Sequence, residues 1–292
     1  MKYTFIKNHE YLFPIEKMCQ VLEVGSSGYF KWKNKPISNR ILRKSEIKQQ
    51  ITSIYFTSKQ RYGSPRITIE LNALGYRISR ITIAKYMKEL GLRSKLSKKF
   101  KVTTDSKHNY LVVENVLDRG FAVDHPSKVW VSDITYIQTK EGFLYLTTIF
   151  DLYDRKMIGW SLSNGMNTEE TTLAAWKMAT RNRSVQKGLI FHSDRGVQYA
   201  NKKNANTIES YEVIRSMSRK GNCWDSAVAE SFFKSLKTEL IYGNKLITKQ
   251  QMELEIFEYI EIWYNKKRRH SALNYKTIEE FNNQNNIYKN VA

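Results

Sequence analysis

The stretch KVWVSDITYIQTKEGFLYLTTIFDLYDRKMIGWSLS, residues 128–163, decides the fold. Valine, isoleucine, tyrosine and threonine dominate it, and two short polar interruptions divide it into three runs of strand length. The interruptions contain Gly142 and Asp154, residue types that favour tight turns. We therefore predict an antiparallel sheet of three consecutive strands, at 128–139, 142–153 and 155–163.

Beyond residue 163, helices alternate with strands. Asn167 with Glu170, and Thr248 with Gln251, have the spacing of capping boxes at helix starts. The order βββαβαβα predicts an α/β core, in which right-handed crossovers add parallel strands to the antiparallel ones and helices flank a mixed sheet. The predicted elements are a helix at 168–182, a strand at 187–193, a short helix at 199–209, a strand at 211–217, and helices at 225–242 and 248–266.

The residues before the core predict an all-helical region with two helix-turn-helix motifs. In the first motif, at 14–34, a break at Gly25 separates two short helices. The second of these helices is expected to expose Tyr29 and Trp32. A longer helix follows at 39–58, with isoleucines at helical spacing.

The second motif spans 62–92, with Ser79 as the N-cap of its second helix. It is expected to bury Ile69, Leu71, Leu74, Ile83, Met87 and Leu90. Cations surround it at the density that phosphate contacts need, namely Arg66, Arg77, Arg80, Lys85 and Lys88. An ordinary helical hairpin is the alternative. We favour DNA binding, with Trp32, Arg66 and Arg80 among the contacts.

The charge of the chain is strongly basic and unevenly spread. The 292 residues have a formal net charge of +20. Residues 1–110 hold 23 lysines and arginines against seven acidic residues, a net +16, and residues 111–292 hold +4. This excess attracts a polyanion, most simply nucleic acid, with an acidic membrane surface as the alternative. No apolar stretch approaches the roughly 20 residues of a membrane span and no signal-like segment opens the chain, so we expect a cytoplasmic protein.

The uneven charge predicts that the basic front half binds the polyanion and that the back half has a different task.

The two cysteines, Cys19 and Cys223, exclude a disulfide framework and a zinc site of paired cysteines. Any metal must therefore be held by oxygen or imidazole. The predicted segments are a helix-turn-helix-like part at 1–38, a helical region with the second motif at 39–92, a basic linker at 93–126, a catalytic core at 127–282 and a tail at 283–292.

Two aspartates stand on predicted strands of the core. In LIFHSDRGVQY, residues 189–199, Asp194 follows an apolar run that reads as the end of a buried strand, where capping a turn is its common use. Asp133 lies within the first strand, where a charge is costly unless it is paired or bound to metal. A right-handed crossover should bring the strand before Asp194 beside the first strand. We therefore expect the two carboxylates at one end of the sheet.

A third acid, Glu230, lies on the helix predicted at 225–242, at the border of its apolar face. Lys234 and Lys237 share its stripe, and a surface Glu–Lys pair is the alternative. Clustered carboxylates repel unless hard cations lie between them, and carboxylate ligands suit Mg²⁺ or Mn²⁺. Two such ions can assist phosphoryl transfer. Asp133, Asp194 and Glu230 are therefore the predicted catalytic and metal-binding residues.

The spacing of 35 residues between Asp194 and Glu230 resembles the D,D(35)E pattern of retroviral integrases and related bacterial transposases. Together with the front blocks YFKW and YGSPRIT, four further blocks closely resemble the catalytic protein encoded by the second reading frame of the third insertion-sequence group. The resemblance covers nearly the whole chain. The four blocks are WVSDITYI (130–137), FHSDRGVQY (191–199), SRKGNCWDSAVAESFFKSLKTE (218–239) and YNKKRRHSALNYKT (264–277).

This resemblance implies an RNase H-like catalytic fold, Mg²⁺ dependence, and cleavage and transfer of DNA strands at the ends of a mobile element in the bacterial nucleoid. It implies double-stranded DNA as the partner and a homo-oligomer on that DNA. It also implies an upstream-frame product, as a partner or a fusion, that carries a helix-turn-helix and a leucine zipper. Ile278 stands where the family usually has proline, which affects the end of the core and not the acids.

The resemblance also implies a mechanism in which water cleaves the phosphodiester at the element's end and the freed 3′-hydroxyl attacks a second phosphodiester. Lys234 and Lys237 should contact the terminal DNA. Arg195 and His192 should steer the scissile phosphate, with a packed strand end as the alternative for His192. Asp151 resembles a supporting position and is not predicted as a ligand. A phosphate-binding run, with a solvated helix end as its alternative, is predicted at Lys266, Lys267, Arg268 and Arg269.

Three other functions have to be weighed. A nuclease of the same fold would cut without joining and would not need the two front motifs. A tyrosine recombinase would use Arg268, Arg269, His270 and Tyr275, but these are crowded into one segment, whereas that chemistry needs arginines from distant places. A non-catalytic DNA-binding regulator would not need three converging acids. A strand-transfer assay with and without Mg²⁺ separates the four.

Overall fold

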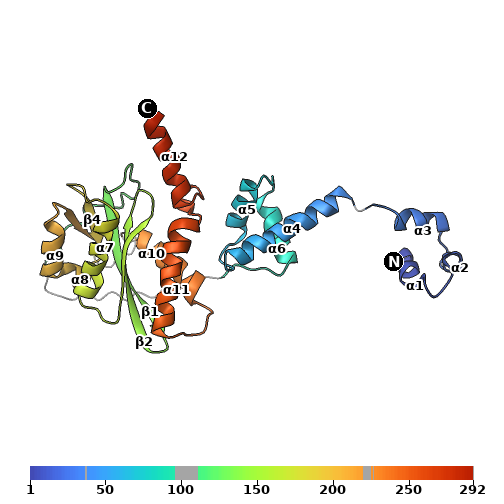
Figure 1. Cartoon of the computed structure of the whole chain (residues 1–292), viewed down its shortest axis with the longest axis horizontal. Helices are drawn as coiled ribbons and strands as arrows, with labels where there is room; N and C mark the ends of the chain where they lie inside the picture. The colour runs from blue at the N-terminus through green and yellow to red at the C-terminus, as the bar shows by residue number, and fades with distance from the viewer. Residues whose placement is uncertain (37, 96–110, 220–224, 226, 292) are drawn as a thin grey trace. The chain divides into compact units, whose positions relative to one another are not determined.

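The computed structural model describes residues 1–36, 38–95, 111–219, 225 and 227–291 (Figure 1). They form two compact units, Met1–Arg93 and Ser94–Ala292. Most of the basic run predicted to begin the linker, and Cys223, lie outside the described residues. Within the described part of the chain, no helix is both long and apolar enough to cross a membrane.

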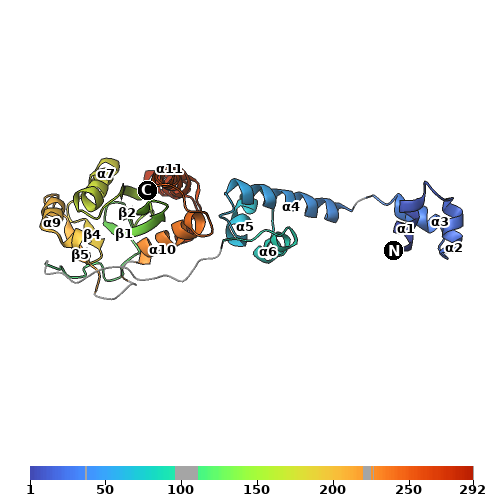
Figure 2. The same cartoon turned by 90° about the horizontal axis from the view of Figure 1, so that it is seen from below.

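The second unit is built on a five-stranded sheet in the order β3-β2-β1-β4-β5 (Figure 2). The first three strands form the antiparallel meander that the sequence predicts, and β4 and β5 join β1 in parallel. The mixed sheet is therefore confirmed. The strands are β1 (Val129–Thr139), β2 (Gly142–Asp151), β3 (Met157–Ser163), β4 (Ile190–Ser193) and β5 (Ile214–Met217).

Helices connect and follow these strands in the predicted order βββαβαβα. The crossovers contain η1 (Glu169–Leu173) with α7 (Ala174–Asn182), and α8 (Val197–Ala200) with α9 (Lys202–Glu209). After β5 come α10 (Ala227–Leu236), η3 (Lys237–Ile241), α11 (Lys249–Phe257), η4 (Glu258–Lys267), η5 (Ser271–Leu273) and α12 (Ile278–Val291). The capping box of Thr248 and Gln251 is present.

Several predicted boundaries differ from the structure by a few residues, and two differences concern the helices after the sheet. The helix predicted at 225–242 is α-helical only as far as Leu236, and the residues after it form the π-helical η3. The segment 283–292, which the sequence sets apart as a tail, is helical to Val291 as part of α12. Neither difference changes the order of the elements.

The two faces of the sheet are covered by different helices, as Figures 1 and 2 show. Adjacent residues of a strand point to opposite faces. Ile149 joins a buried cluster with Trp176 of α7, whereas the ring of Phe150 lies 5.0 Å from that of Phe232 in α10. A side chain at Gly159 of β3 would collide with the backbone of α7, so glycine permits this close packing. The sheet and α10 are therefore fixed relative to each other by buried aromatic contacts.

The first unit is helical, and both predicted helix-turn-helix motifs are present as helix pairs. In the second, Ser79 caps α6 by accepting a hydrogen bond of 3.3 Å from the Thr82 amide, and Leu71, Ile83 and Met87 are buried as predicted. Leu74 is instead 60% exposed, and Ile67 fills the core. The helices are α1 (Lys2–His9), α2 (Ile15–Val21), α3 (Ser26–Lys33), α4 (Asn39–Thr57), α5 (Ser64–Ala73) and α6 (Arg80–Glu89).

The prediction that α3 exposes Tyr29 is wrong. The side chain of Tyr29 is completely buried, and its hydroxyl donates a hydrogen bond of 2.7 Å to Glu10. Trp32, three residues later, is 39% exposed. The hydroxyl of Tyr29 finds a partner on α1's C-terminal side, so its aromatic ring can serve as core.

A segment before the sheet belongs to the second unit and not to a free linker. We call residues 112–119 the arm. The backbone carbonyl of Glu114 accepts a hydrogen bond of 3.3 Å from the Met217 amide of β5. The Ser216 hydroxyl accepts hydrogen bonds from the amides of Val116, at 2.9 Å, and Leu117, at 3.2 Å. The linker predicted at 93–126 therefore includes a part that is bonded to the catalytic sheet.

Candidate active site

The strand register brings Asp133 and Asp194 side by side. In the parallel pairing of β1 with β4, Val131 is the partner of His192. Asp133 and Asp194 each stand two residues further along their own chain. Neighbouring strands lie about 4.8 Å apart, so the two aspartates occupy adjacent positions where β4 ends. The adjacency expected from the right-handed crossover is therefore present.

Asp194 also has the local role that its position suggests. The amide of Gly196 donates a hydrogen bond of 2.8 Å to Asp194 Oδ1, which closes a tight turn after β4. Arg195 Nε donates a hydrogen bond of 2.6 Å to the carbonyl of Ser218. The turn is thus fixed on the strand ends, and the half-buried Asp194 carboxylate is held there with it.

The electrostatics of Asp133 link the three predicted acids and Lys237. Burial raises the pKa of Asp133 well above its ordinary value, and the negative charge of Asp194 raises it further. Glu230 acts in the same direction, whereas the Ile134 amide and the Lys237 ammonium lower the pKa. Asp133 is therefore within electrostatic reach of two carboxylates and one ammonium group.

Glu230 lies in the first turn of α10, next to the buried Ala229. It is half-buried, and burial raises its pKa. In the described residues, no three acidic, histidine or cysteine side chains stand close enough together to hold a metal ion as they are. The fold thus brings Asp133 and Asp194 side by side, and Glu230 lies close enough for its charge to affect Asp133.

The two lysines on the stripe of Glu230 have different surroundings. Lys234 is exposed on α10. Lys237 begins η3 and is half-buried; burial lowers its pKa, and the charge of Asp133 raises it. Lys237 is therefore a cation beside the acids, and Lys234 is available to a ligand that covers the surface.

Two residues that sequence reasoning missed lie beneath the acids. The hydroxyl of Tyr199 is hydrogen-bonded to the hydroxyl of Ser132 at 2.7 Å, and both side chains are buried. Burial raises the pKa of Tyr199 well above its ordinary value, as do the charges of Asp133 and Asp194. The pair bonds α8 to β1, and no local sequence pattern indicates it.

Comparison with known proteins identifies the family. Residues 123–223 and 230–285 match the family description integrase core domain, and residues 43–100 match HTH-like domain. The chain is 40% identical to transposase InsF of insertion sequence IS3A from Escherichia coli strain K12, over 98% of this chain and 99% of that protein. The chain belongs to the IS3 family of transposases.

A second relative of this transposase is an uncharacterized 31 kDa protein of insertion element IS600 from Shigella sonnei. It is 40% identical over 88% of the transposase chain and 94% of its own length. Among solved structures, the HTLV-2 integrase catalytic core domain in complex with magnesium gives a TM-score of 0.40 at 16% identity, covering 53% of this chain and 96% of that one.

Family membership confirms the fold and the reaction class. The transposase has an RNase H-like integrase core and an HTH-like domain, and it catalyses cleavage and transfer of DNA strands. Nothing in the comparisons favours a nuclease that only cuts or a non-catalytic regulator.

The DNA contact predicted for His192 of the transposase is wrong in this structure. The side chain is 1% exposed. Its Nδ1 is hydrogen-bonded to Ser216 Oγ at 2.9 Å and its Nε2 to Ser218 Oγ at 3.1 Å. Burial lowers the pKa of His192 to about 4, so the ring is neutral at physiological pH. The packed strand end, the alternative interpretation, is the one that the structure supports.

The predicted phosphate-binding run divides into two exposed and two buried residues. Arg268 is 6% exposed and bonded to Glu239, and Arg269 is 8% exposed and bonded to Glu280. These two arginines hold the C-terminal helices together and are not available to DNA here. Lys266 and Lys267 are exposed.

The DNA contacts predicted in the first unit remain on its surface. Arg80 is exposed at the start of α6. Arg66 is partly buried, with its guanidinium 5.7 Å from the centre of the Tyr62 ring. The ring of Trp32 lies 5.7 Å from that of Tyr3. None of the three is enclosed in the core.

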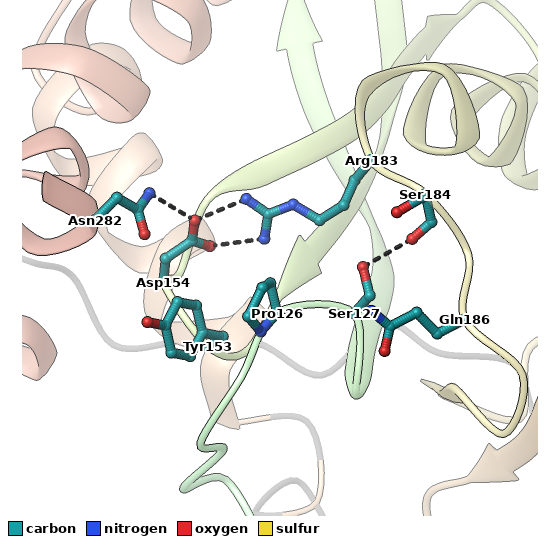
Figure 3. Close-up of a pocket in the computed structure, with 8 residues that line it drawn as sticks. All are labelled: Pro126, Ser127, Tyr153, Asp154, Arg183, Ser184, Gln186 and Asn282. Atoms are coloured by element: carbon teal, nitrogen blue, oxygen red, sulfur yellow. Dashed lines mark hydrogen bonds and ion pairs between the residues drawn. The ribbon is translucent and has the colours of Figure 1, made fainter. Parts of the chain in front are cut away.

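Asp151, which resembles a supporting position, belongs to a buried network separate from Asp133 and Asp194. It accepts hydrogen bonds from the Ser127 amide and the Trp130 indole, and forms an ion pair of 2.6 Å with Arg183. Arg183 also binds Asp154, which Asn282 of α12 contacts in a pocket of about 300 Å³ (Figure 3). This network joins β1, the β2–β3 turn, α7 and α12.

Proposed function

We propose that Asp133, Asp194 and Glu230 are the catalytic triad of this transposase. Together they hold two divalent cations, Mg²⁺ or Mn²⁺. The supporting observation is the adjacency of Asp133 and Asp194 in the strand register, together with the rise that the charge of Asp194 causes in the pKa of Asp133. A pair of carboxylates that resist being charged together gains most from a bound cation. Oxygen is also the only donor type that the three residues offer.

The chemistry expected of the bound ions is activation of the attacking oxygen and stabilisation of the leaving oxygen in phosphoryl transfer. The chain's own residues then align the DNA. Asp194 is held by the turn after β4, and Ser132 with Tyr199 supports the sheet beneath it. Lys237 and Arg195, beside the acids, contact the scissile strand in this proposal. Water first cleaves the element's end, and the 3′-hydroxyl then attacks the target.

The remaining assignments concern the partners. Double-stranded DNA is the substrate, both as element ends and as target. The helical unit carries the predicted contacts Trp32, Arg66 and Arg80, and the catalytic unit adds Lys234, Lys266 and Lys267. We propose that the chain acts on bacterial nucleoid DNA in the cytoplasm, as a homo-oligomer, and with an upstream-frame partner.

The test replaces each acid by its isosteric amide. Asp133→Asn, Asp194→Asn and Glu230→Gln should each abolish cleavage and joining of DNA carrying the element's ends, while DNA binding persists. Asp124→Asn is the matched control, because Asp124 is 71% exposed and pairs with Lys128 outside the site. Normal turnover by a purified triad variant, in Mg²⁺, would remove that residue from the site.

A further inference from the structure

A buried aspartate that no prediction used lies just before the catalytic helix. Asp225 has a fully buried side chain, and it stands two residues before the first residue of α10. Its carboxylate receives five hydrogen bonds from three residues. The donors are Asn115 Nδ2 at 2.9 Å, Arg119 Nε at 3.1 Å, and the backbone amide, Nε and Nη2 of Arg219 at 2.9, 3.0 and 3.0 Å.

These contacts tie three parts of the fold together. Asn115 and Arg119 belong to the arm, and Arg219 follows β5. Hydrogen bonds from Arg219 hold the pKa of Asp225 well below its usual range, so the carboxylate is charged at physiological pH. Asp225 also lies within electrostatic reach of His192, two residues before Asp194. The arrangement is a charged anchor between the sheet end and the start of α10.

The position of Glu230 depends on this anchor. Glu230 lies in the first turn of α10, and first turns fray because their amides lack intrahelical partners. The buried side chains of Ala229, Phe232 and Phe233 pack the helix itself against the unit. Asp225 bonds the chain just before this first turn to the arm and to Arg219.

We propose that Asp225 is a positioning residue that, through its bonds to the arm and to Arg219, holds Glu230 where it completes the metal site. The inference rests on the proposed function of Glu230 as a ligand. Groups that orient a ligand from behind change metal affinity about 10- to 100-fold when they are removed. Asp225 itself touches neither metal nor DNA in this assignment.

The test measures binding of Mn²⁺ to the full-length chain by electron paramagnetic resonance, alongside thermal unfolding. Asp225→Asn keeps the volume and removes the charge, and its arginine partners are 46% and 47% exposed, so water can solvate them. We expect the affinity for one Mn²⁺ to fall about 10- to 100-fold, and high Mg²⁺ to restore strand transfer. Asp124→Asn, at an aspartate that is 71% exposed and pairs with Lys128 outside the arm, should bind as the unchanged protein does.

A double variant separates positioning from a general loss of structure. If Asp225 acts through Glu230, then Asp225→Asn combined with Glu230→Gln should bind Mn²⁺ no more weakly than Glu230→Gln alone. Arg119→Met, which removes one donor of the anchor, should give a smaller loss in the same direction and serves if Asp225→Asn fails to fold. A lowered active fraction with unchanged Mn²⁺ affinity would overturn the inference.

The two proposals fail in different ways. If Glu230→Gln binds Mn²⁺ as tightly as the unchanged chain, then Glu230 is not a ligand and the proposed function is at fault. If Glu230→Gln loses affinity and neither Asp225→Asn nor Arg119→Met does, then the triad stands and the positioning role of Asp225 is wrong.

Discussion

Replacing Arg268 by alanine should lower the stability of the second unit. The DNA affinity of the folded protein should stay unchanged. Arg268 and Glu239 have side chains that are each 7% exposed, and Arg268 Nη2 lies 3.0 Å from Glu239 Oε1. Glu239 also accepts hydrogen bonds from Tyr259, at 2.9 Å, and Trp263, at 3.1 Å. Without Arg268 the buried Glu239 carboxylate loses the guanidinium charge that lies against it.

The magnitude follows from the burial of the pair. Removing one partner of a buried ion pair costs about 3–5 kcal/mol in the free energy of unfolding. In a unit of this size, each kcal/mol lowers the melting temperature by about 2–4 °C, so Arg268→Ala should lower it by about 6–20 °C. The pair of changes Arg268→Met and Glu239→Gln should recover part of this loss, because no unpaired charge remains.

Thermal unfolding followed by circular dichroism measures the effect, with DNA affinity measured well below the lowest melting temperature. Lys266→Ala is the control, since Lys266 is exposed in the same basic run and its loss should change stability by no more than about 0.5 kcal/mol. If Arg268→Ala melts with the unchanged protein but binds DNA more weakly, then Arg268 is a DNA contact and the buried pair is not what keeps it in place.

Lys237→Ala should weaken crosslinking to the element's terminal bases and leave Mn²⁺ affinity unchanged or higher, because the ammonium lies beside Asp133 and opposes a bound cation; lost affinity with full crosslinking would reverse these roles. A fragment beginning at Leu111 should fold and bind Mg²⁺ but lose its preference for element ends and show a flatter salt dependence, since residues 1–110 carry +16 of the net charge. Equal discrimination by fragment and full chain on specific and scrambled ends, across a salt series, would contradict this. Burial raises the pKa of Tyr264 to about 12 from 10.0, so its contribution of about 3 kcal/mol is complete below pH 10 and is lost as the pH rises through 12. In urea titrations, the free energy of unfolding of Tyr264→Phe should therefore fall less between pH 10 and 12 than that of the unchanged protein. The same fall in both proteins would refute the assignment.

The sheet could be predicted from the sequence because its signals are local. Strand-forming residues between tight turns mark β1, β2 and β3, and the handedness of crossovers places β4 beside β1. The adjacency of Asp133 and Asp194 follows from that topology, without knowledge of any side-chain contact. The change from α10 to the π-helical η3 has no such signal.

The roles of the polar residues could not be predicted in the same way. Arg268 is buried because it pairs with Glu239, which lies 29 residues earlier in the sequence. Two of the five donors to Asp225 come from the arm, 106 and 110 residues earlier in the sequence. A basic run or a strand-end histidine looks the same in sequence whether water or a buried partner surrounds it. Such residues are assigned only once the elements around them are placed.

The arm has a consequence for the solubility of the catalytic unit. β5 is the last strand of the sheet, and a bare edge strand offers its backbone to other chains, which promotes aggregation. Here the carbonyl of Glu114 accepts a hydrogen bond from the amide of Met217, and Leu117 is buried beside the strand. A protein shortened to begin at residue 127 would keep Asp133, Asp194 and Glu230 but lose the arm. The arm therefore covers the Met217 end of this edge strand, and its removal would uncover that end.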